Sequence, residues 1–279
     1  MTSRMGVLDR AARRYRRAQW LAESLGFIPR KLPNRLGLRG GPRVLATSVP
    51  KSGTFLLERA LCLHPGLYRQ LRRTVFDSRI RSEGEFRSLI GSIQPSQVVM
   101  AHVASGPGYR ELLRVGGATT VFMIRDPRDV VVSHAHYVAT TNQHWLFELY
   151  RDADPRQRLR MSIEGVPEAG LRSVAETLRV FERWLEDADL VVRFEDLVGD
   201  SGGGDHGRQR DVLEELYRVL GVDRSDAVVD YVQPRVFSRT ANTFRRGSVG
   251  NWREELDDEI LDLFHRVAGE ELVRYGYGW

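Results

Sequence analysis

The chain has 279 residues, of which 42% are hydrophobic and 28% are charged, an ordinary composition for a globular protein with a full core. Its single cysteine, Cys62, excludes an intrachain disulfide, and its apolar runs are too short to cross a bilayer. The amino terminus shows no apolar stretch of secretory length, so we expect a cytoplasmic protein.

The positive charge is concentrated at the amino end. Residues 1–43 contain eleven basic side chains against two acidic ones, a net charge of +9, whereas the whole chain carries +5 and the remainder is therefore −4. We divide the chain into a basic arm and linker, residues 1–42, and a domain, residues 43–279. Because the excess of basic residues belongs to the arm, no nucleic-acid partner is expected for the domain.

A helix is expected within this arm. Four arginines within residues 13–17 stand beside Trp20 and Leu21, a pattern typical of a basic amphipathic helix. Such a helix either lies on an anionic membrane or a partner, or packs on the domain with a solvated face, and we favour the packed helix. The segment Pro33–Pro42, rich in glycine, proline and arginine, is predicted to be a linker.

Strands and helices alternate from residue 43 onwards. Short apolar runs predict buried strands at Arg43–Val49, Val98–Val103, Thr119–Ile124 and Leu190–Phe194. Apolar periodicity and turn residues predict helices at Gly53–Leu63, Pro107–Leu113, Pro127–Tyr137, Leu171–Leu185, Val212–Leu220 and Ile260–Val273. The glycine-rich segment Asp200–Gly207 is predicted to be a mobile loop. This alternation is typical of an α/β protein with a mainly parallel central sheet.

Lysine is rare in this chain, which has 42 basic residues but only two lysines, Lys31 and Lys51. Lys51 lies in Pro50-Lys51-Ser52-Gly53-Thr54, between the first predicted strand and the following helix. Ligands of open parallel sheets bind at the carboxyl ends of the strands, and the backbone N–H groups and helix dipole there favour an anion. The ATP-binding P-loop requires Gly-Lys followed by Ser or Thr, and that order is absent. Taken alone, the motif is equally compatible with a surface turn.

The third predicted strand ends in Arg125, and Ser133 lies two turns into the helix that follows. Arg125 offers a bidentate fork to a phosphate group and Ser133 offers a hydroxyl. The alternative is a structural ion pair between Arg125 and Asp126, Asp129 or Glu195.

A third motif is the segment Phe244–Trp252, in which two adjacent arginines are followed by Gly-x-x-Gly. This pattern predicts a flexible cationic clamp for an anion. A solvated basic loop is the alternative when the motif is taken alone.

Together the three motifs resemble the sulfotransferases that use 3′-phosphoadenosine-5′-phosphosulfate. The resemblance runs in the expected order from Arg43 to Trp252. It implies a P-loop-like three-layer α/β sandwich and an enzyme that transfers a sulfuryl group from this donor.

The resemblance also implies roles for individual residues. The site of the 5′-phosphosulfate resembles the loop of Lys51, Ser52, Gly53 and Thr54. The pair that holds the 3′-phosphate resembles Arg125 and Ser133. The remainder of the 3′-phosphate site resembles Arg245, Arg246 and Gly247. His102 falls where the family has its general base, although a lone buried histidine is more often structural. Lys51, His102 and Ser133 are therefore the expected catalytic residues.

The sequence departs from the well-studied cytosolic members around the expected adenine site. Phe55 and Leu56 stand where those members have a threonine and a tryptophan, and Phe194 replaces a tyrosine. Asn251 stands where aspartate is common. The aromatic residues Phe55, Phe194 and Phe237 are the candidate contacts to the donor base.

Sulfuryl transfer is an in-line displacement in which charge grows on the bridging oxygen, by analogy with phosphoryl transfer. Lys51 is expected to neutralise that oxygen and His102 to take the proton of the acceptor hydroxyl. Arginines are expected to meet the donor phosphates, so no metal is expected. We expect the acceptor to be a small molecule, a lipid or a carbohydrate, and residues 64–95 and 134–170 to shape its pocket.

Two other functions compete with this interpretation. A nucleotide kinase or NTPase needs a carboxylate at a strand end to organise a metal, whereas the third predicted strand ends in Arg125. A non-catalytic nucleotide-binding module with a basic anchoring arm is the second alternative. His134 and His136 do not suggest a metal site, because residues two apart on a helix diverge by roughly 200°.

Overall fold

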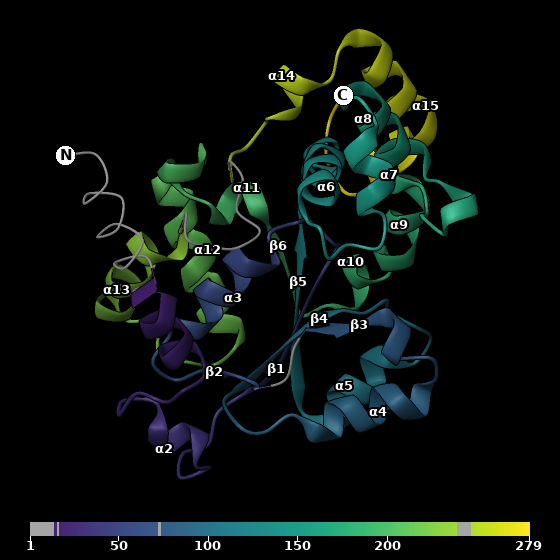
Figure 1. Ribbon diagram of the computed structural model, residues 1–279. Helices are drawn as coiled ribbons and strands as arrows, with labels where there is room; N and C mark the ends of the chain where they lie inside the picture. Colours follow the sequence, from purple (N-terminus) through teal and green to yellow (C-terminus); the bar gives the residue numbers. More distant parts are fainter. Residues whose placement is uncertain (1–13, 16, 72–73, 239–246) are drawn as a thin grey trace, which may run out of the picture.

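The structure is a computed structural model that describes residues 14–15, 17–71, 74–238 and 247–279. Its strands form one sheet in the order β2-β4-β1-β5-β6, with β3 beside β4, and each pairing is parallel. The strands are β1 (Arg43–Ser48), β2 (Tyr68–Arg69), β3 (Val75–Phe76), β4 (Gln97–His102), β5 (Ala118–Ile124) and β6 (Leu190–Arg193). Helices cover both faces of this sheet (Figure 1), which confirms the predicted three-layer α/β architecture.

Side chains alternate between the two faces of the sheet and enter two separate hydrophobic cores. In β1, for example, Val44 and Ala46 face one layer of helices and Leu45 faces the other. The layer over Val44 contains α3 (Thr54–Cys62), α11 (Phe194–Leu197), α12 (His206–Val219) and α13 (Asp226–Val236). The layer over Leu45 contains α4 (Glu83–Ser92), α5 (Tyr109–Gly116), α6 (Pro127–Thr140), α8 (Pro155–Glu164), α9 (Val174–Phe181), α10 (Trp184–Asp187) and α15 (Asp258–Arg274).

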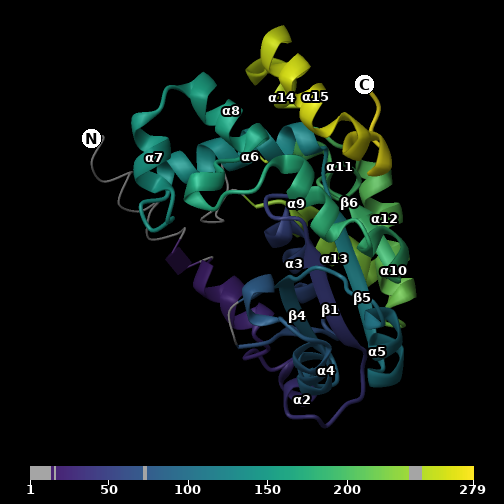
Figure 2. The same cartoon turned by 90° about the vertical axis from the view of Figure 1, so that its right-hand side faces the viewer.

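The strand ends are level at the carboxyl edge of the sheet. Ser48 pairs with Met123 and Ile124 pairs with Arg193 in the parallel register. The segments that follow β1, β4, β5 and β6 therefore converge at one edge, from which α6 leaves the sheet (Figure 2). This is the edge at which open parallel sheets bind their ligands.

Some predicted elements differ from those observed. The predicted helix Leu171–Leu185 is two helices, α9 and α10, and Phe194 begins α11 rather than ending a strand. The predicted loop Asp200–Gly207 contains a 3-10 turn, Asp200–Gly202, and the first residues of α12. Helices α4, α8 and α13, together with α7 (Phe147–Asp152) and α14 (Trp252–Glu255), had no predicted counterpart.

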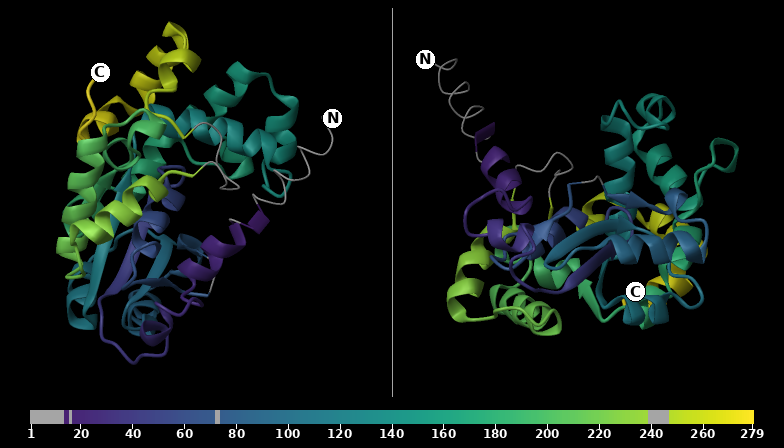
Figure 3. Two further views of the ribbon diagram at one scale, coloured as in Figure 1. Left: turned by 90° about the vertical axis from the view of Figure 1, so that its left-hand side faces the viewer. Right: turned by 90° about the horizontal axis from the view of Figure 1, so that it is seen from below.

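The described part of the amino-terminal arm contacts the layer that contains α3. Residues 17–24 are helical (purple in Figure 3). The Trp20 ring lies 4.9 Å from that of Phe55. Lys31 is buried, and its ammonium group donates a hydrogen bond to the carbonyl oxygen of Cys62. The expected linker contains a helical turn, α2 (Leu32–Arg35).

Within the described residues, no helix combines the length and apolar character needed to span a membrane.

Candidate functional site

The loop between β1 and α3 carries the predicted anion-binding residues. Ser52 donates its backbone N–H to the carbonyl of Val49 at 3.1 Å, which closes the turn. Lys51 has φ of 71°, in the left-handed region that a residue with a side chain seldom adopts, and Gly53 has φ of 96°. Helix α3 begins at Thr54, and no side chain of the described residues caps its amino end. The dipole of this helix and its first N–H groups therefore remain available to an anion.

Glycine is required at position 53 because an aromatic ring fills the space beside it. A Cβ atom on Gly53 would lie 2.6 Å from Cδ2 of Phe194. Phe194 is buried directly after β6, and the central carbon of the Arg125 guanidinium lies 4.3 Å from its ring centroid. The predicted base contact Phe194 thus lies between the anion-binding loop and Arg125.

Arg125 joins the end of β5 to the clamp segment, which we define as residues 247–252. Its Nη2 donates to the carbonyl of Ser248 at 2.8 Å and lies 3.5 Å from Oδ2 of Asp129. Asp129 in turn accepts the backbone N–H of Gly250 at 2.8 Å and that of Trp252 at 3.0 Å. The clamp segment is therefore held against the start of α6 by one carboxylate and one guanidinium.

Of the three acids considered as partners of Arg125, only Asp129 forms an ion pair with it. Asp126 caps α6 and pairs with Arg128 at 2.8 Å, and Glu195 accepts the backbone N–H of Asp126 at 2.9 Å. Burial raises the pKa of the Asp129 carboxyl group, although Arg125 and two backbone N–H groups oppose that shift. This ion pair leaves Nε of Arg125 buried and without a hydrogen-bond partner among the described residues.

The remaining predicted donor contacts are only partly described. The carbonyl oxygen of Gly247 packs against Gly202, and the Phe237 ring borders the same glycine. Arg245 and Arg246 lie outside the described residues. The predicted contact Phe55 is half-buried, and its ring lies on Trp20 of the amino-terminal helix.

His102, the predicted base, is anchored at the end of β4. Its Nδ1 lies 2.9 Å from the carbonyl oxygen of Ser48, and the Ser48 hydroxyl lies 2.7 Å from that of Thr54. A carbonyl oxygen accepts only, so Nδ1 carries the proton and Nε2 keeps its lone pair. Burial lowers the pKa of His102, and Lys51 lowers it further. The residue is thus neutral and has a free nitrogen for proton transfer.

The Lys51 ammonium lies against an aromatic face. Its Nζ is 3.6 Å from the ring centroid of Tyr137 on α6. Burial lowers the pKa of Lys51 to about 7, and the positive charge of Arg125 contributes to the shift. No carboxylate in the described part of the chain forms an ion pair with Lys51. An anion is therefore the partner that this lysine lacks.

One row of residues along α6 connects these features. Asp129, Ser133 and Tyr137 are spaced by four residues and so share one face of the helix. Asp129 holds Arg125, and Tyr137 holds Lys51. The predicted residue Ser133, half-buried, lies between these two contacts along the row.

A second group of polar and aromatic side chains surrounds Lys51 on the side of α7 and α8. Nδ1 of His134 lies 2.9 Å from the hydroxyl of Ser162, which is 3.1 Å from that of Tyr150. The His134 and His144 rings lie 6.4 Å apart. Burial lowers the pKa of His134 to about 4, and His144 and Lys51 add to that effect, so His134 is neutral.

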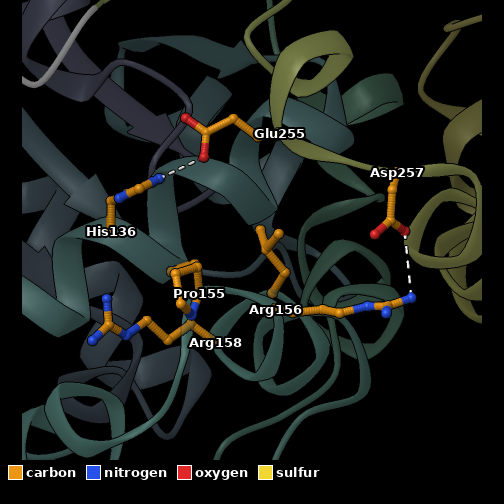
Figure 4. A pocket seen from close by; sticks show the side chains of 8 residues that line it. His136, Pro155, Arg156, Arg158, Glu255 and Asp257 are labelled. Atoms are coloured by element: carbon orange, nitrogen blue, oxygen red, sulfur yellow. Dashed lines mark hydrogen bonds and ion pairs between the residues drawn. The ribbon is translucent and has the colours of Figure 1, made fainter.

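His136 belongs to a different pocket. Its Nε2 lies 2.8 Å from Oε2 of Glu255, in a pocket of about 210 Å³ between α6, α8 and α14 (Figure 4). Arg156 and Asp257 form a second ion pair at 3.6 Å across the same pocket. Neither Lys51 nor His102 lines it, so this pocket is separate from the candidate catalytic edge.

Sequence reasoning did not identify three residues that shape the site. Ser48 was part of a predicted strand, Asp129 was only a possible ion-pair partner, and Tyr137 was one of several pocket aromatics. The signal for Ser48 was a hydroxyl residue immediately before a turn that contains a rare lysine. The roles of Asp129 and Tyr137 depend on contacts with residues that are distant in the sequence, which no local pattern indicates.

The site has the properties of an anion-binding site. The buried hydroxyl of Ser52 and Nε of Arg125 have no hydrogen-bond partner in the described structure. Among the described residues, no carboxylate pairs with Lys51 and no side chain caps the amino end of α3. A phosphate or sulfate group would meet each of these unsatisfied groups, so the residues fit a donor that carries such groups.

The parallel sheet with helices on both faces makes this an α/β protein, and the groups that its described residues leave unpaired at the carboxyl edge of the sheet suit an anionic ligand. The chain belongs to the sulfotransferase family, because the sequence profile described as "Sulfotransferase domain" matches residues 41–276. The search of curated proteins found no match to the sequence.

Similar solved structures support the fold. A mouse sulfotransferase, SULT7A1 complexed with PAP, is 16% identical, with a TM-score of 0.56 over 83% of this chain and 84% of the other. Retinol dehydratase complexed with androsterone and the inactive cofactor PAP is 15% identical, with a TM-score of 0.57 over 91% and 93% of the two chains. Retinol dehydratase with retinol and PAP gives 15% identity and a TM-score of 0.54 over 91% and 94%.

Proposed function

We propose that the protein transfers a sulfuryl group from 3′-phosphoadenosine-5′-phosphosulfate to a hydroxyl group of a small molecule, lipid or carbohydrate. One observation carries the proposal. The loop after β1 brings Lys51, for which the described residues offer no carboxylate partner, next to His102, whose Nε2 makes no hydrogen bond in the described structure. Such a pair serves a reaction in which one oxygen gains charge while another loses a proton.

The donor site follows from the residues around that pair. The 5′-phosphosulfate would be held by Lys51, Ser52, Gly53 and Thr54. The 3′-phosphate would be held by Arg125, Ser133, Arg245, Arg246 and Gly247. The base would contact Phe55, Phe194 and Phe237. PAP, the product of this donor, is present in the similar structures named above. When bound, the donor supplies an activated sulfuryl group whose leaving oxygen belongs to a phosphate.

In this proposal the two catalytic side chains have separate tasks. His102 takes the proton of the acceptor hydroxyl at Nε2, and its Nδ1–H stays bonded to the Ser48 carbonyl, which fixes the ring. Lys51 neutralises the oxygen that is left with negative charge. Ser48 positions His102 directly. It also positions the loop that carries Lys51, through its contact with Thr54.

The acceptor side is lined by exposed aromatic side chains. Phe76 is 52% exposed, with its ring 5.5 Å from that of His102, and Trp145 is 64% exposed, with its ring stacked on His144. Side chains of this kind favour an acceptor with an apolar surface next to its hydroxyl group. Androsterone and retinol in the retinol dehydratase complexes carry such surfaces.

The test is a transfer assay with donor labelled in the sulfuryl group and a cell extract as the source of acceptors. We expect label in an extracted product with the wild-type enzyme, and strong loss of label with Lys51→Ala and with His102→Ala. Unchanged transfer in both variants would contradict the assigned roles. Binding of PAP with no transfer to any acceptor would instead favour a non-catalytic nucleotide-binding module.

A second proposal concerns the arm, residues 1–42, which we regard as an addition to the catalytic domain, residues 43–279. Among its described residues, Tyr15, Phe27 and Leu38 are exposed beside several arginines. Apolar side chains with neighbouring positive charge favour peripheral contact with an anionic membrane. Co-sedimentation with anionic vesicles, compared with neutral vesicles, tests it, and Leu38→Asp should weaken the binding.

A further inference from the structure

Lys51 has a defined resting position on Tyr137. Its Nζ lies 3.6 Å from the ring centroid, whereas no carboxylate of the described residues pairs with it. We propose that Tyr137 is a positioning residue that keeps the Lys51 ammonium charged and oriented at the loop until the donor anion takes its place. This inference builds on the proposed function of Lys51 and names a residue that controls it.

The charges around Lys51 explain why it needs such a partner. Burial lowers the pKa of Lys51, and Arg125 lowers it further. Burial also lowers the pKa of His102, His134 and His144, and Lys51 adds to that effect. Each of these groups faces the ammonium from a different element and is either positive or becomes positive on protonation. The Tyr137 ring is the one described neighbour whose electrostatics favour the charged lysine, through the negative face of its π system.

The position of Tyr137 connects the lysine to both sides of the site. On α6 it follows Ser133 by one turn and Asp129 by two turns, so the helix fixes it relative to the Arg125 ion pair. On its other side the ring meets that of His144 edge to face at 5.7 Å, and His144 stacks on Trp145. Tyr137 therefore sets the lysine with respect to the donor clamp and the acceptor loop together.

Two variants separate the aromatic face from the rest of the side chain. Tyr137→Phe keeps the ring, so the alkaline limb of kcat/KM for the donor should stay at its wild-type position. Tyr137→Leu removes the π system, so the lysine loses its stabilising partner and its pKa falls further. Because the donor anion takes the place of the ring, the effect belongs to the free enzyme. We expect kcat/KM for the donor to fall roughly tenfold, with its alkaline limb moved to lower pH in this variant alone.

The scarcity of lysine allows a direct measurement on the intact protein. Lysine labelled with carbon-13 at Cε gives signals from only two side chains, Lys31 and Lys51. The ring current of Tyr137 should move the Lys51 signals upfield in the wild-type protein and in Tyr137→Phe, and this shift should vanish in Tyr137→Leu. Buried Lys31, bonded to the Cys62 carbonyl, is the internal control for folding. Saturation with PAP should remove the upfield shift of Lys51 in the wild-type protein.

The outcomes distinguish this inference from the proposed function. Unshifted Lys51 signals in the wild-type protein, or an identical Lys51 titration in Tyr137→Leu, overturn the role of Tyr137 even if transfer is observed. Shifted signals that respond to Tyr137→Leu support it, even if no acceptor is found and the proposed activity fails.

Discussion

The donor side and the acceptor side of the candidate site are built in different ways. The donor side joins segments that are far apart in the chain, for example Arg125 with the carbonyl of Ser248, 123 residues away. The acceptor side is assembled mostly from neighbouring segments, for example His134 with Ser162, 28 residues away, although Phe76 joins it from β3. It ends in exposed rings such as Trp145. The first set of contacts depends on the whole fold, whereas the second can change within one local region.

This difference suggests a division of tasks. A donor shared by a family requires a preformed anion site, and the buried contacts of Gly53, Phe194 and Asp129 supply it. An acceptor that differs between members requires a surface that tolerates substitution, and half-exposed side chains on α6, α7 and β3 supply that. Substitutions on the donor side should therefore reduce stability and donor binding together, whereas those on the acceptor side should affect acceptor use alone.

The largest expected effect is the pH dependence on the donor side. Only charged Lys51 can neutralise the leaving oxygen, and its pKa in the free enzyme is lowered to about 7 by burial and by Arg125. We therefore expect kcat/KM for the donor to fall about tenfold for each pH unit above that value. Bound phosphate groups favour the charged lysine and raise its pKa, so the fall in kcat should begin at higher pH.

The acid limb of the same profile concerns His102, which must be neutral to accept a proton. Burial and Lys51 lower its pKa below the ordinary 6.5, so activity should persist as the pH falls through that value. Steady-state rates measured with donor and acceptor varied in turn provide both limbs. Coincident alkaline limbs for kcat and kcat/KM would contradict the role assigned to Lys51.

Gly53→Ala should disturb the donor side next most strongly. Its Cβ would meet the Phe194 ring at 2.6 Å, and φ is 96°, so we expect a loss of about 2–4 kcal/mol in the free energy of unfolding. Gly221→Ala is the matched control, with φ of 63° and no atom within 4 Å of the added Cβ. Denaturant unfolding of both variants isolates the steric conflict, and equal losses would show that Phe194 does not restrict this position.

Asp129→Asn should loosen the clamp segment. The amide keeps one acceptor oxygen for Trp252 but loses the bond to Gly250 and the charge opposite Arg125. We expect a loss of about 1–3 kcal/mol in stability and weaker binding of PAP in calorimetry. The exposed ion pair of Asp152 with Arg151 gives a control, Asp152→Asn, which should change neither quantity.

Local sequence patterns predicted the strands and the turn of the donor side better than the other elements of the molecule. Apolar runs predicted β1, β4 and β5 because both faces of these strands are buried, and they predicted β6 although it is only half-buried. A turn signal after β1 marked Lys51 and Gly53. Helix α13 was missed because Pro234 lies inside it, and the break between α9 and α10 has no glycine or proline to mark it. Asp129 and Tyr137 acquire their roles only from tertiary contacts.

Trp145→Ala should have the smallest effect and provides the test of the acceptor side. The side chain is 64% exposed and its described contact is the stacked ring of His144, so stability should change by about 0.5 kcal/mol or less. PAP affinity should be unchanged, because in the described structure the rings of His144 and Tyr137 stand between Trp145 and Lys51. If Trp145 touches the acceptor, KM for the acceptor should rise several-fold while kcat for saturated substrate stays near the wild-type value. A fall in PAP affinity equal to that of Asp129→Asn would show that the two sides of the site are not independent.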